Sequence, residues 1–455
     1  MSVALGIPTA RTAAPGGTTG LTPGAEPGAA PGATHAETHV GRHAALPADR
    51  PTGPAASALL DRFGRTATDL RISLTDRCNL RCTYCMPAEG LPFLPPPALL
   101  TRDEITRLAR IAVTEFGVRQ IRFTGGEPLL RKDLVDIVRD VAALDPRPEI
   151  SLTTNAIGLA SRAQALADAG LDRINVSLDS VHPETFAAIT RRPFLSRVLA
   201  GIDAVSAAGL VQTKINTVLM PGVNDDQAVE LLEWALAGGH QLRFIEQMAL
   251  DADRTWERDT MITAAQIRER LSTRYVLTPH DAPRDGAPAE LFQVRDRPQS
   301  APASSGPAAT ADDDPATATT PGPAADPTSA ATAIDGPTAT TSDGPAAVAD
   351  PAAIPDPTSA TATAGRMLGL VGIIASVSEP FCSDCRRTRL TAEGGVRSCL
   401  FSHDETDLLG PMRAGASDQV VADLWRTAMW GKPAGHEMNA VGFAQPERTM
   451  SAIGG

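Results

Sequence analysis

Short apolar runs alternate with longer amphipathic segments from about residue 70 to residue 245. The runs have the length of strands, and the segments between them carry the spacing of apolar residues typical of helices. The predicted strands are Leu70–Leu74, Gln120–Thr124, Glu149–Thr154, Arg173–Leu178, Gln212–Leu219 and Gln241–Ile245. The predicted helices cover about 101–116, 131–144, a segment that ends at Gly170, segments that end at Gly209, and 225–237. The first begins with a capping box, Thr101 with Glu104, and stops at Gly117.

Repeated strand–helix units predict a parallel sheet in an α/β fold. Six units favour an incomplete (β/α)6 TIM-type barrel, although a doubly wound open sheet fits the same pattern. Polar residues follow or end several strands, and ligands bind at the carboxyl ends of parallel strands. The residues concerned are Thr153–Asn155, Ser177, Asp179, Lys214, Asn216 and Glu246–Met248. Their placement on one rim favours the barrel and a single active site.

Two segments depart from this pattern, residues 1–58 and 298–364. Both are rich in Ala, Pro, Thr and Gly, and neither has enough apolar surface to offset the entropy of ordering. We expect both to be disordered, which leaves a partial barrel over 59–297 and a C-terminal region over 365–455. The insert also supplies much of the formal net charge of −12. Nucleic-acid binding favours basic faces, so the acidic total argues against it.

All six cysteines fall into two triplets, which is the most specific chemical signal in the chain. Cys78, Cys82 and Cys85 have the spacing C-x3-C-x2-C, and Cys382, Cys385 and Cys399 have the spacing C-x2-C-x13-C. Thiolates grouped in this way bind soft metal centres, and a four-iron cluster held by three cysteines keeps one iron open for a small molecule.

Other interpretations of the triplets are structural zinc and disulfides. His403 could complete a zinc site with the second triplet. The N-terminal sequence has no signal-peptide pattern, and the longest apolar run, Met367–Val377, is too short to cross a bilayer. We therefore expect a cytoplasmic protein with reduced thiols and no membrane partner.

The first triplet and the turn Gly125-Gly126-Glu127-Pro128 together resemble the radical S-adenosylmethionine (SAM) superfamily. The resemblance implies that SAM chelates the open iron and is cleaved to a 5′-deoxyadenosyl radical. It also implies a backbone contact between the glycine turn and SAM, since glycine permits close approach. The residues that match the SAM contacts of the superfamily are Tyr84, Gly126, Ser177 and Met248.

The stretch from Phe381 to Thr391, with the second triplet, resembles the GTP 3′,8-cyclase family of molybdenum cofactor biosynthesis. The resemblance implies a second [4Fe-4S] cluster that binds the guanine of GTP, hydrogen abstraction from ribose C3′, and ring closure onto C8. The predicted GTP contacts are Arg71, Arg122, Thr153, Lys214, Arg387, Thr388 and Arg389. Arginine suits phosphate oxygens independently of the resemblance. The terminal Gly454-Gly455 pair is implied to reach into the active site in a catalytic role.

The resemblance further implies partners: GTP as substrate, an electron donor of flavodoxin or ferredoxin type, and a downstream cyclic pyranopterin monophosphate synthase. It leaves a homodimer open. Two residues depart from the family pattern, Arg386 in place of Asn and Ala156 in place of Gly. The alternatives are a two-cluster radical SAM enzyme that acts on another substrate such as a peptide, a two-cluster electron carrier, and a zinc-stabilised binding module.

Overall fold

The computed structural model describes residues 53–54, 57–210, 213–297, 365–440 and 442–454. Of the segments predicted to be disordered, 1–58 lies outside these ranges except for residues 53–54 and 57–58, and 298–364 lies wholly outside them. Gly455 also lies outside the described residues. Leu59, at the predicted start of the partial barrel, is fully buried. In the described ranges no helix is both long and apolar enough to span a bilayer.

Six parallel strands form the centre of one sheet, and they are the strands that the sequence predicts. Their bounds are β1 Asp69–Ser73, β2 Gln120–Thr124, β3 Glu149–Thr154, β4 Arg173–Ser177, β5 Lys214–Val218 and β6 Gln241–Ile245. Each strand pairs with the next in chain order. A doubly wound sheet requires a reversal of strand order. The six strands follow one another in sequential order, which confirms the incomplete TIM-type barrel and excludes the doubly wound sheet.

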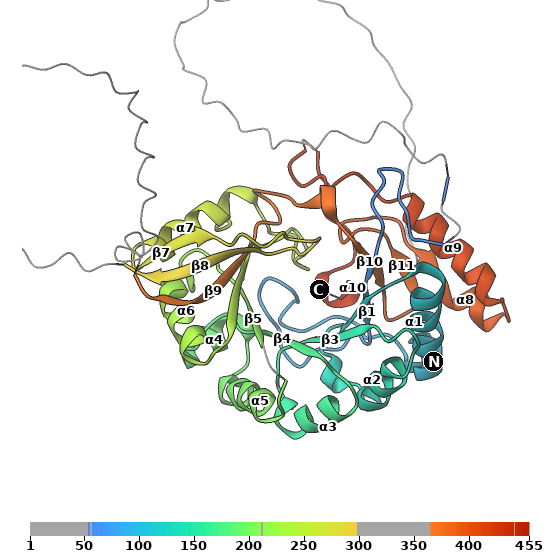
Figure 1. Ribbon diagram of the computed structural model, residues 1–455, viewed down its shortest axis with the longest axis horizontal. Coiled ribbons are helices and arrows are strands. Elements are labelled where there is room, and N and C mark those ends of the chain that lie inside the picture. Colours follow the sequence, from blue (N-terminus) through green and yellow to red (C-terminus); the bar gives the residue numbers. More distant parts are fainter. Residues whose placement is uncertain (1–52, 55–56, 211–212, 298–364, 441, 455) are drawn as a thin grey trace, which may run out of the picture. The chain divides into compact units, whose positions relative to one another are not determined.

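Helices connect these strands and cover the outer face of the sheet (Figure 1). They are α1 Arg102–Phe116, α2 Leu134–Ala142, α3 Ala163–Asp168, α4 Pro183–Thr190, α5 Leu195–Ala207, α6 Ala228–Ala237 and α7 Ala264–Ser272. The predicted capping box of α1 is present, and Gly117 ends the helix in the left-handed conformation. Short 3₁₀ turns occur at Pro96–Ala98, Pro128–Leu130, Leu159–Ser161, Asp225–Gln227, Arg258–Thr260 and Cys382–Asp384.

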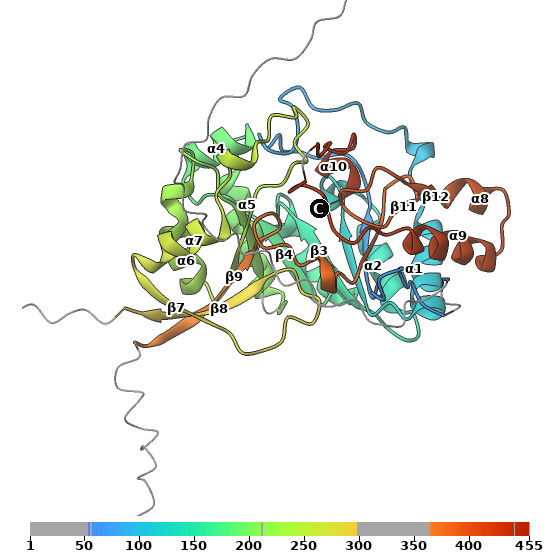
Figure 2. The same ribbon diagram turned by 90° about the horizontal axis from the view of Figure 1, so that it is seen from above.

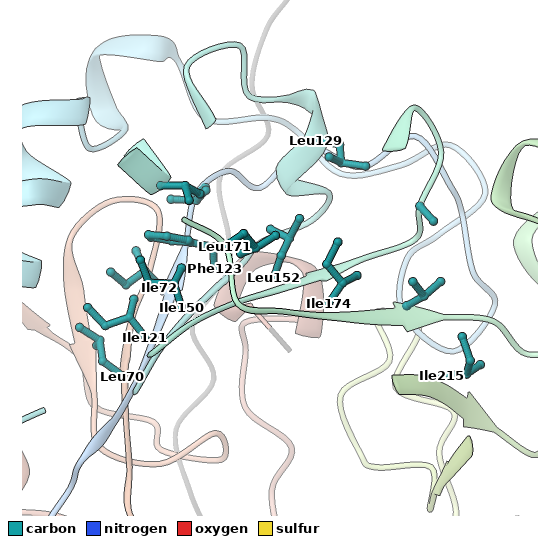
Figure 3. Close-up of a cluster of buried hydrophobic side chains, with 14 of the residues drawn as sticks. Leu70, Ile72, Ile121, Phe123, Leu129, Ile150, Leu152, Leu171, Ile174 and Ile215 are labelled. Atoms are coloured by element: carbon teal, nitrogen blue, oxygen red, sulfur yellow. The ribbon is translucent and has the colours of Figure 1, made fainter. Parts of the chain in front are cut away.

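The period of two along each strand separates the core from the site. Alternate residues such as Leu70, Phe123 and Ile174 point outward and pack in the apolar layer beneath the helices (Figure 3). The residues between them point to the inner face, which is polar. The core therefore lies between the sheet and the helices, and the concave face of the sheet is left for chemistry.

The sheet continues on both sides beyond the six predicted strands. Next to β6 lie β9 Met367–Ile374, β8 Glu290–Asp296 and β7 Tyr275–Pro279; next to β1 lie β10 Arg387–Leu390, β11 Gly395–Arg397 and β12 Thr406–Asp407. The chain then forms α8 Leu409–Arg413, α9 Asp418–Trp430 and α10 Met450–Ile453. Because β9 and β10 are parallel to β6 and β1, the C-terminal region joins both sides of the barrel sheet.

The segment 298–364 is inserted into a hairpin. Its flanking strands β8 and β9 pair antiparallel, and the Asp296 amide donates to the Arg366 carbonyl at 3.1 Å. The residues that flank the insert therefore meet at the loop end of the hairpin, away from the carboxyl ends of the barrel strands.

We predict that replacing 298–364 by a short Gly/Ser turn leaves fold and activity intact. Each halving of a flexible loop lowers its closure cost by about 0.6 kcal/mol, so the shortened protein should gain on the order of 2 kcal/mol in unfolding free energy. Urea denaturation of the full-length and shortened proteins measures this, with cluster content determined in both. A large loss of activity at full cluster content would contradict the interpretation of 298–364 as a dispensable insert.

Candidate functional site

The first cysteine loop and the glycine turn after β2 are packed backbone to backbone. The amide of Gly126 donates to the Thr75 carbonyl at 2.7 Å, and the amide of Glu127 donates to the Arg77 carbonyl at 2.7 Å. A Cβ atom on Gly126 would lie 2.3 Å from the Arg77 oxygen, and one on Gly125 would lie 2.5 Å from the Thr75 oxygen. Glycine is therefore required at both positions by the position of the cysteine loop.

Glu127 ties the same turn to the end of β3. Its carboxylate accepts hydrogen bonds from the Thr154 hydroxyl at 2.6 Å and from the Asn155 amide at 2.7 Å. Complete burial raises the pKa of the Glu127 carboxyl to about 7, and these hydrogen bonds oppose that rise. Asn155 in turn donates to Asn79 at 2.7 Å and to the Cys78 sulfur at 3.8 Å. The ends of β2 and β3 thus support the loop that carries the cysteines.

The three cysteines of the first triplet lie together, as ligands of a metal centre would. Cys78, Cys82 and Cys85 line one pocket with the glycine turn. Burial and the neighbouring Cys78 thiol raise the pKa of Cys85 to about 12, and burial raises that of Cys78 to about 11. No three Cys, His, Asp or Glu side chains of the described ranges are grouped as a single metal ion requires. The donor set of three cysteine sulfur atoms fits an iron–sulfur cluster.

The second triplet lies against fixed cations. Cys382, Cys385 and Cys399 line the central cavity. The buried Lys432 ammonium donates to the Cys385 sulfur at 3.4 Å and to the Arg387 carbonyl at 2.8 Å. Burial opposes ionisation of Cys385, but Arg387 and Lys432 overcome it and lower the pKa of the thiol to about 6. This donor set also suits a soft iron–sulfur centre.

Three arginines lie side by side on the inner face of the sheet. The strand register places Arg71 of β1 opposite Arg389 of β10 on one side and opposite Arg122 of β2 on the other. Neighbouring strands are about 4.8 Å apart, so three positive charges form one row. Arg387 and Arg243 line the same cavity.

These cations have no carboxylate partner, since none of the described ion pairs includes them. The Nε of Arg71 is buried without a hydrogen bond. Burial and mutual repulsion lower the pKa of Arg389 to about 10, that of Arg243 to about 9, and that of Arg71 well below its usual value. Uncompensated buried charge is costly, so the cavity is built for an anion that carries several charges.

The predicted SAM residues surround the junction of the two pockets. Tyr84 and Ser177 line both, Gly126 lines the pocket of the first triplet, and Met248 lines the central cavity. The Tyr84 hydroxyl donates to Asp179 at 2.7 Å, and burial raises the pKa of the Asp179 carboxyl to about 6. A ligand at this junction would touch both cysteine loops.

Two of the predicted GTP residues are not on the cavity wall. Thr388 alternates with the arginines of β10, so its side chain points outward and accepts a hydrogen bond from Trp425 at 3.0 Å. Lys214 begins β5, two residues before the cavity-lining Asn216. Burial and the nearby Arg243, Arg173 and Arg122 lower the pKa of Lys214 to about 7. Thr153 does line the cavity.

The C-terminal tail lies within the curve of the sheet, where Figure 1 places α10 and the chain end. Arg389 donates to the Gly454 carbonyl at 2.7 Å. Gly454 has φ +83°, and a Cβ atom there would lie 2.8 Å from the Thr124 methyl carbon. Met450 lines both pockets, and Ser451 is hydrogen-bonded to the Cys85 sulfur. The tail therefore contacts the first cysteine loop and the arginine row.

Three contributors to the site were not predicted from the sequence. Lys432 and Arg243 are single cations with no motif around them, and Arg243 is recognisable only as a charge inside an apolar strand. Arg448 pairs with Glu393 and, at 3.1 Å, with Glu405, which anchors the tail to the region that carries Cys399. Such contacts join residues far apart in the chain and leave no local signal.

Two known protein families match the sequence of this chain. The Radical SAM superfamily matches residues 72–235, and the Molybdenum Cofactor Synthesis C family matches residues 347–438. The chain is 51% identical to a GTP 3′,8-cyclase of Paenarthrobacter nicotinovorans, over 90% of this chain and all of the relative. It is 50% identical to a GTP 3′,8-cyclase of Mycolicibacterium smegmatis, over 88% of this chain and 93% of the relative. A crystal structure of Streptococcus suis SuiB with S-adenosylmethionine superimposes with a TM-score of 0.37 at 17% identity, over 46% of this chain and 47% of SuiB.

The glycine turn, the first triplet and the parallel strand ends therefore define a radical SAM enzyme, which uses SAM and a [4Fe-4S] cluster. Similarity over nearly the whole chain narrows the class: the chain belongs to the GTP 3′,8-cyclase family. The electron carrier and the zinc-stabilised module are thereby excluded.

We predict that Gly126→Ala separates the glycine turn from the cysteine loop. The added methyl would overlap the Arg77 carbonyl, so we expect a loss of roughly 1–3 kcal/mol in unfolding free energy and poor cluster retention. Gly431→Ala is the matched control, because its nearest atom would be the Ala428 oxygen at 3.4 Å. Urea unfolding and iron analysis of both variants provide the measurement. Equal behaviour would show that the close approach is unimportant.

Proposed function

We propose that this protein converts GTP to (8S)-3′,8-cyclo-7,8-dihydroguanosine 5′-triphosphate, the first step of molybdenum cofactor biosynthesis. The observation that carries the proposal is the row of unpaired arginines in a cavity lined by the second cysteine triplet and adjoining the first. A nucleoside triphosphate supplies the charge that these arginines lack, and the same family membership gives it as GTP.

Two [4Fe-4S] clusters would be held by the cysteines. We assign Cys78, Cys82 and Cys85 to cluster 1, and Cys382, Cys385 and Cys399 to cluster 2. When bound, cluster 1 supplies the electron that cleaves SAM, and cluster 2 supplies an open iron for the guanine base. Asn155 and Lys432 support the proposal, because they direct N–H groups at the sulfur atoms of Cys78 and Cys385.

For SAM we propose contacts from Tyr84, Gly126, Ser177 and Met248. Their place at the junction of the pockets supports a cofactor that reaches from cluster 1 toward the substrate. The buried Asp179 carboxylate accepts a hydrogen bond from the Tyr84 hydroxyl, which supports a junction with little solvent access, where a reactive species is protected from side reactions.

For the triphosphate we propose the guanidinium groups of Arg71, Arg122, Arg387 and Arg389, with Thr153 beside them. Since the Thr388 side chain points outward, we assign its part to the backbone between the two arginines. Lys214 would add positive charge from the start of β5, two residues before the cavity-lining Asn216. A bound polyanion would raise the pKa of Lys214 toward its ordinary value. Arg243, on the same cavity wall, completes the positive field.

We assign a catalytic positioning role to the Gly454-Gly455 tail. Its contact with Arg389 supports a position beside the triphosphate site, and Ser451 links it to cluster 1. Arg386 makes ion pairs with Asp285 and Asp384 at the surface, so its departure from the family pattern leaves the cavity unaffected. Ala156, the other departure, has φ +62°, a conformation that favours glycine.

The remaining partners follow from this chemistry. Cluster 1 needs a one-electron donor of flavodoxin or ferredoxin type, and the product passes to a cyclic pyranopterin monophosphate synthase. We propose a cytoplasmic location, where thiols stay reduced. Anaerobic incubation with GTP, SAM and dithionite, followed by mass spectrometry, tests the function. Formation of 5′-deoxyadenosine without a cyclised GTP product would contradict it.

Metal content provides an independent prediction. Reconstituted protein should hold about eight iron and eight sulfide, the sum of two four-iron clusters. Changing all of Cys78, Cys82 and Cys85 to Ala should halve the content and abolish SAM cleavage. Changing the second triplet should also halve it and leave some SAM cleavage. Native protein with zinc at the second triplet would contradict the assignment of cluster 2.

A tail truncation is expected to separate binding from catalysis. Deleting Gly454 and Gly455 removes the acceptor of Arg389 but no core residue, so folding, both clusters and GTP binding should persist. Misplacement of reacting groups by about 1 Å can cost on the order of 10²-fold in rate, and single-turnover cyclisation should fall by this amount. Equal rates for full-length and truncated protein would refute the catalytic role.

A further inference from the structure

Four arginines and one exposed phenylalanine lie on and beside the first cysteine loop. They are Arg77, Arg81, Arg191, Arg192 and Phe93, which we call the basic face. Arg191 and Arg192 follow the last residue of α4. The loop and the end of α4 are joined by hydrogen bonds from the amides of Arg81 and Thr83 to carbonyl groups of α4. Figure 2 shows α4 and the light blue loop segment along the same upper edge.

The guanidinium groups of the basic face bond to carbonyl groups of the loop. Arg81 donates to the carbonyls of Cys78 and Leu80, each at 2.8 Å. Arg191 donates to the carbonyls of Arg81 at 3.1 Å and Met86 at 2.9 Å. These neutral acceptors fix the direction of the side chains and leave their positive charge uncompensated.

Of the other members, Arg77 and Phe93 are exposed to solvent, whereas Arg192 is partly buried. The Cζ atom of Arg77 lies over the Phe93 ring, 5.2 Å from the ring centroid, and Phe93 is 41% exposed. Arg192 donates to the Arg191 carbonyl at 2.7 Å. None of the four arginines is in an ion pair with a described carboxylate. An exposed aromatic ring flanked by unpaired arginines has the composition of a protein interface.

The charge here opposes that of the whole chain. Residues 76–93 and 191–197 contain five basic side chains and two acidic ones, whereas the chain has 41 basic and 53 acidic residues. Of the two acids, Asp76 is used internally, since it accepts from the Leu94 amide at 2.6 Å. These two segments therefore carry a local excess of positive charge.

Backbone strain at Arg191 indicates that its position matters beyond the helix end. Its φ of +55° is in the left-handed region, where a residue other than glycine is disfavoured. Glycine or asparagine would end α4 without this cost. The conformation directs the guanidinium at the cysteine loop.

The cavity side of the first triplet is lined by the C-terminal tail. Met450 and Ser451 of the tail line that pocket, and Ser451 contacts Cys85. A macromolecular electron donor must therefore approach from the outer side of the loop, where the basic face lies.

The geometry points to the basic face as the docking surface for an acidic one-electron carrier. One electron leaves the reduced carrier and enters cluster 1, so the carrier is oxidised by one electron as the cluster is reduced. This inference rests on the proposed function, which requires cluster 1 to be reduced before SAM is cleaved. Electrostatic attraction would raise the rate of encounter, and salt would weaken it.

The test uses reconstituted protein and a reduced flavodoxin as the acidic carrier. Arg77→Glu, Arg192→Glu and the double variant reverse charge without removing the loop hydrogen bonds of Arg81 and Arg191. Arg366→Glu is the control, because this residue is 82% exposed and lies at the start of the distant β9. Stopped-flow absorbance gives the rate of cluster reduction, and calorimetry gives the dissociation constant of the complex.

We expect the double variant to lose roughly tenfold or more in the flavodoxin rate at low ionic strength, within the range of electrostatic steering. Binding should weaken in parallel, and the difference should shrink at high salt. Reduction by dithionite, the midpoint potential and iron content should match wild type, as should all properties of Arg366→Glu.

Two outcomes would overturn the inference. The flavodoxin rate could be unchanged in the double variant, or dithionite reduction and the midpoint potential could change with it. The second outcome would assign the arginines to tuning of the cluster. Failure of the proposed function is distinguishable, because wild-type protein would then form no cyclised GTP with dithionite as reductant.

Discussion

Repulsion among buried arginines is the constraint on which the site depends. Arg389, Arg71 and Arg122 lie in register across three strands, and none of them forms an ion pair with a carboxylate of the described residues. The strands cannot separate, because their outward residues form the core beneath the helices. The fold therefore holds like charges together, and a polyanionic ligand offsets the resulting electrostatic cost when it binds.

The C-terminal region closes the site from two directions. Its β10 adds two arginines to one side of the sheet, and its β9 extends the other side. Glu246, at the end of β6, accepts hydrogen bonds from the amides of Ala264, Val377 and Ser378, which fixes the segment after β9 to the rim. One chain thus forms a single cavity from two regions that each carry a cysteine triplet.

The sequence predicted the parts of this structure that depend on local patterns. The strand Gln120–Thr124 and the capping box at Thr101 are confirmed to the residue, because apolar periodicity and capping are local properties. The flanking strands were missed for physical reasons. The glycines within Met367–Ile374 weaken its strand pattern, and the four residues of Arg387–Leu390 are too few to show a period. Lys432 and Arg448 act over long chain separations, so only the folded structure brings them to the cysteine regions. The direction of Thr388 follows from alternation on β10, but that requires the strand to be known first.

The position of the tail also bears on how the protein can be handled. Gly454 lies against Thr124 and Ser73, with its carbonyl bonded to Arg389 inside the sheet. Because Gly454 lies inside the sheet, an affinity tag or fused domain attached at this end has to pass these contacts or displace α10. An attachment at the loop end of the β8–β9 hairpin avoids these contacts of the tail. A tag at this end would therefore disturb the contacts of the tail with Arg389 and Cys85, even in protein that carries every cysteine.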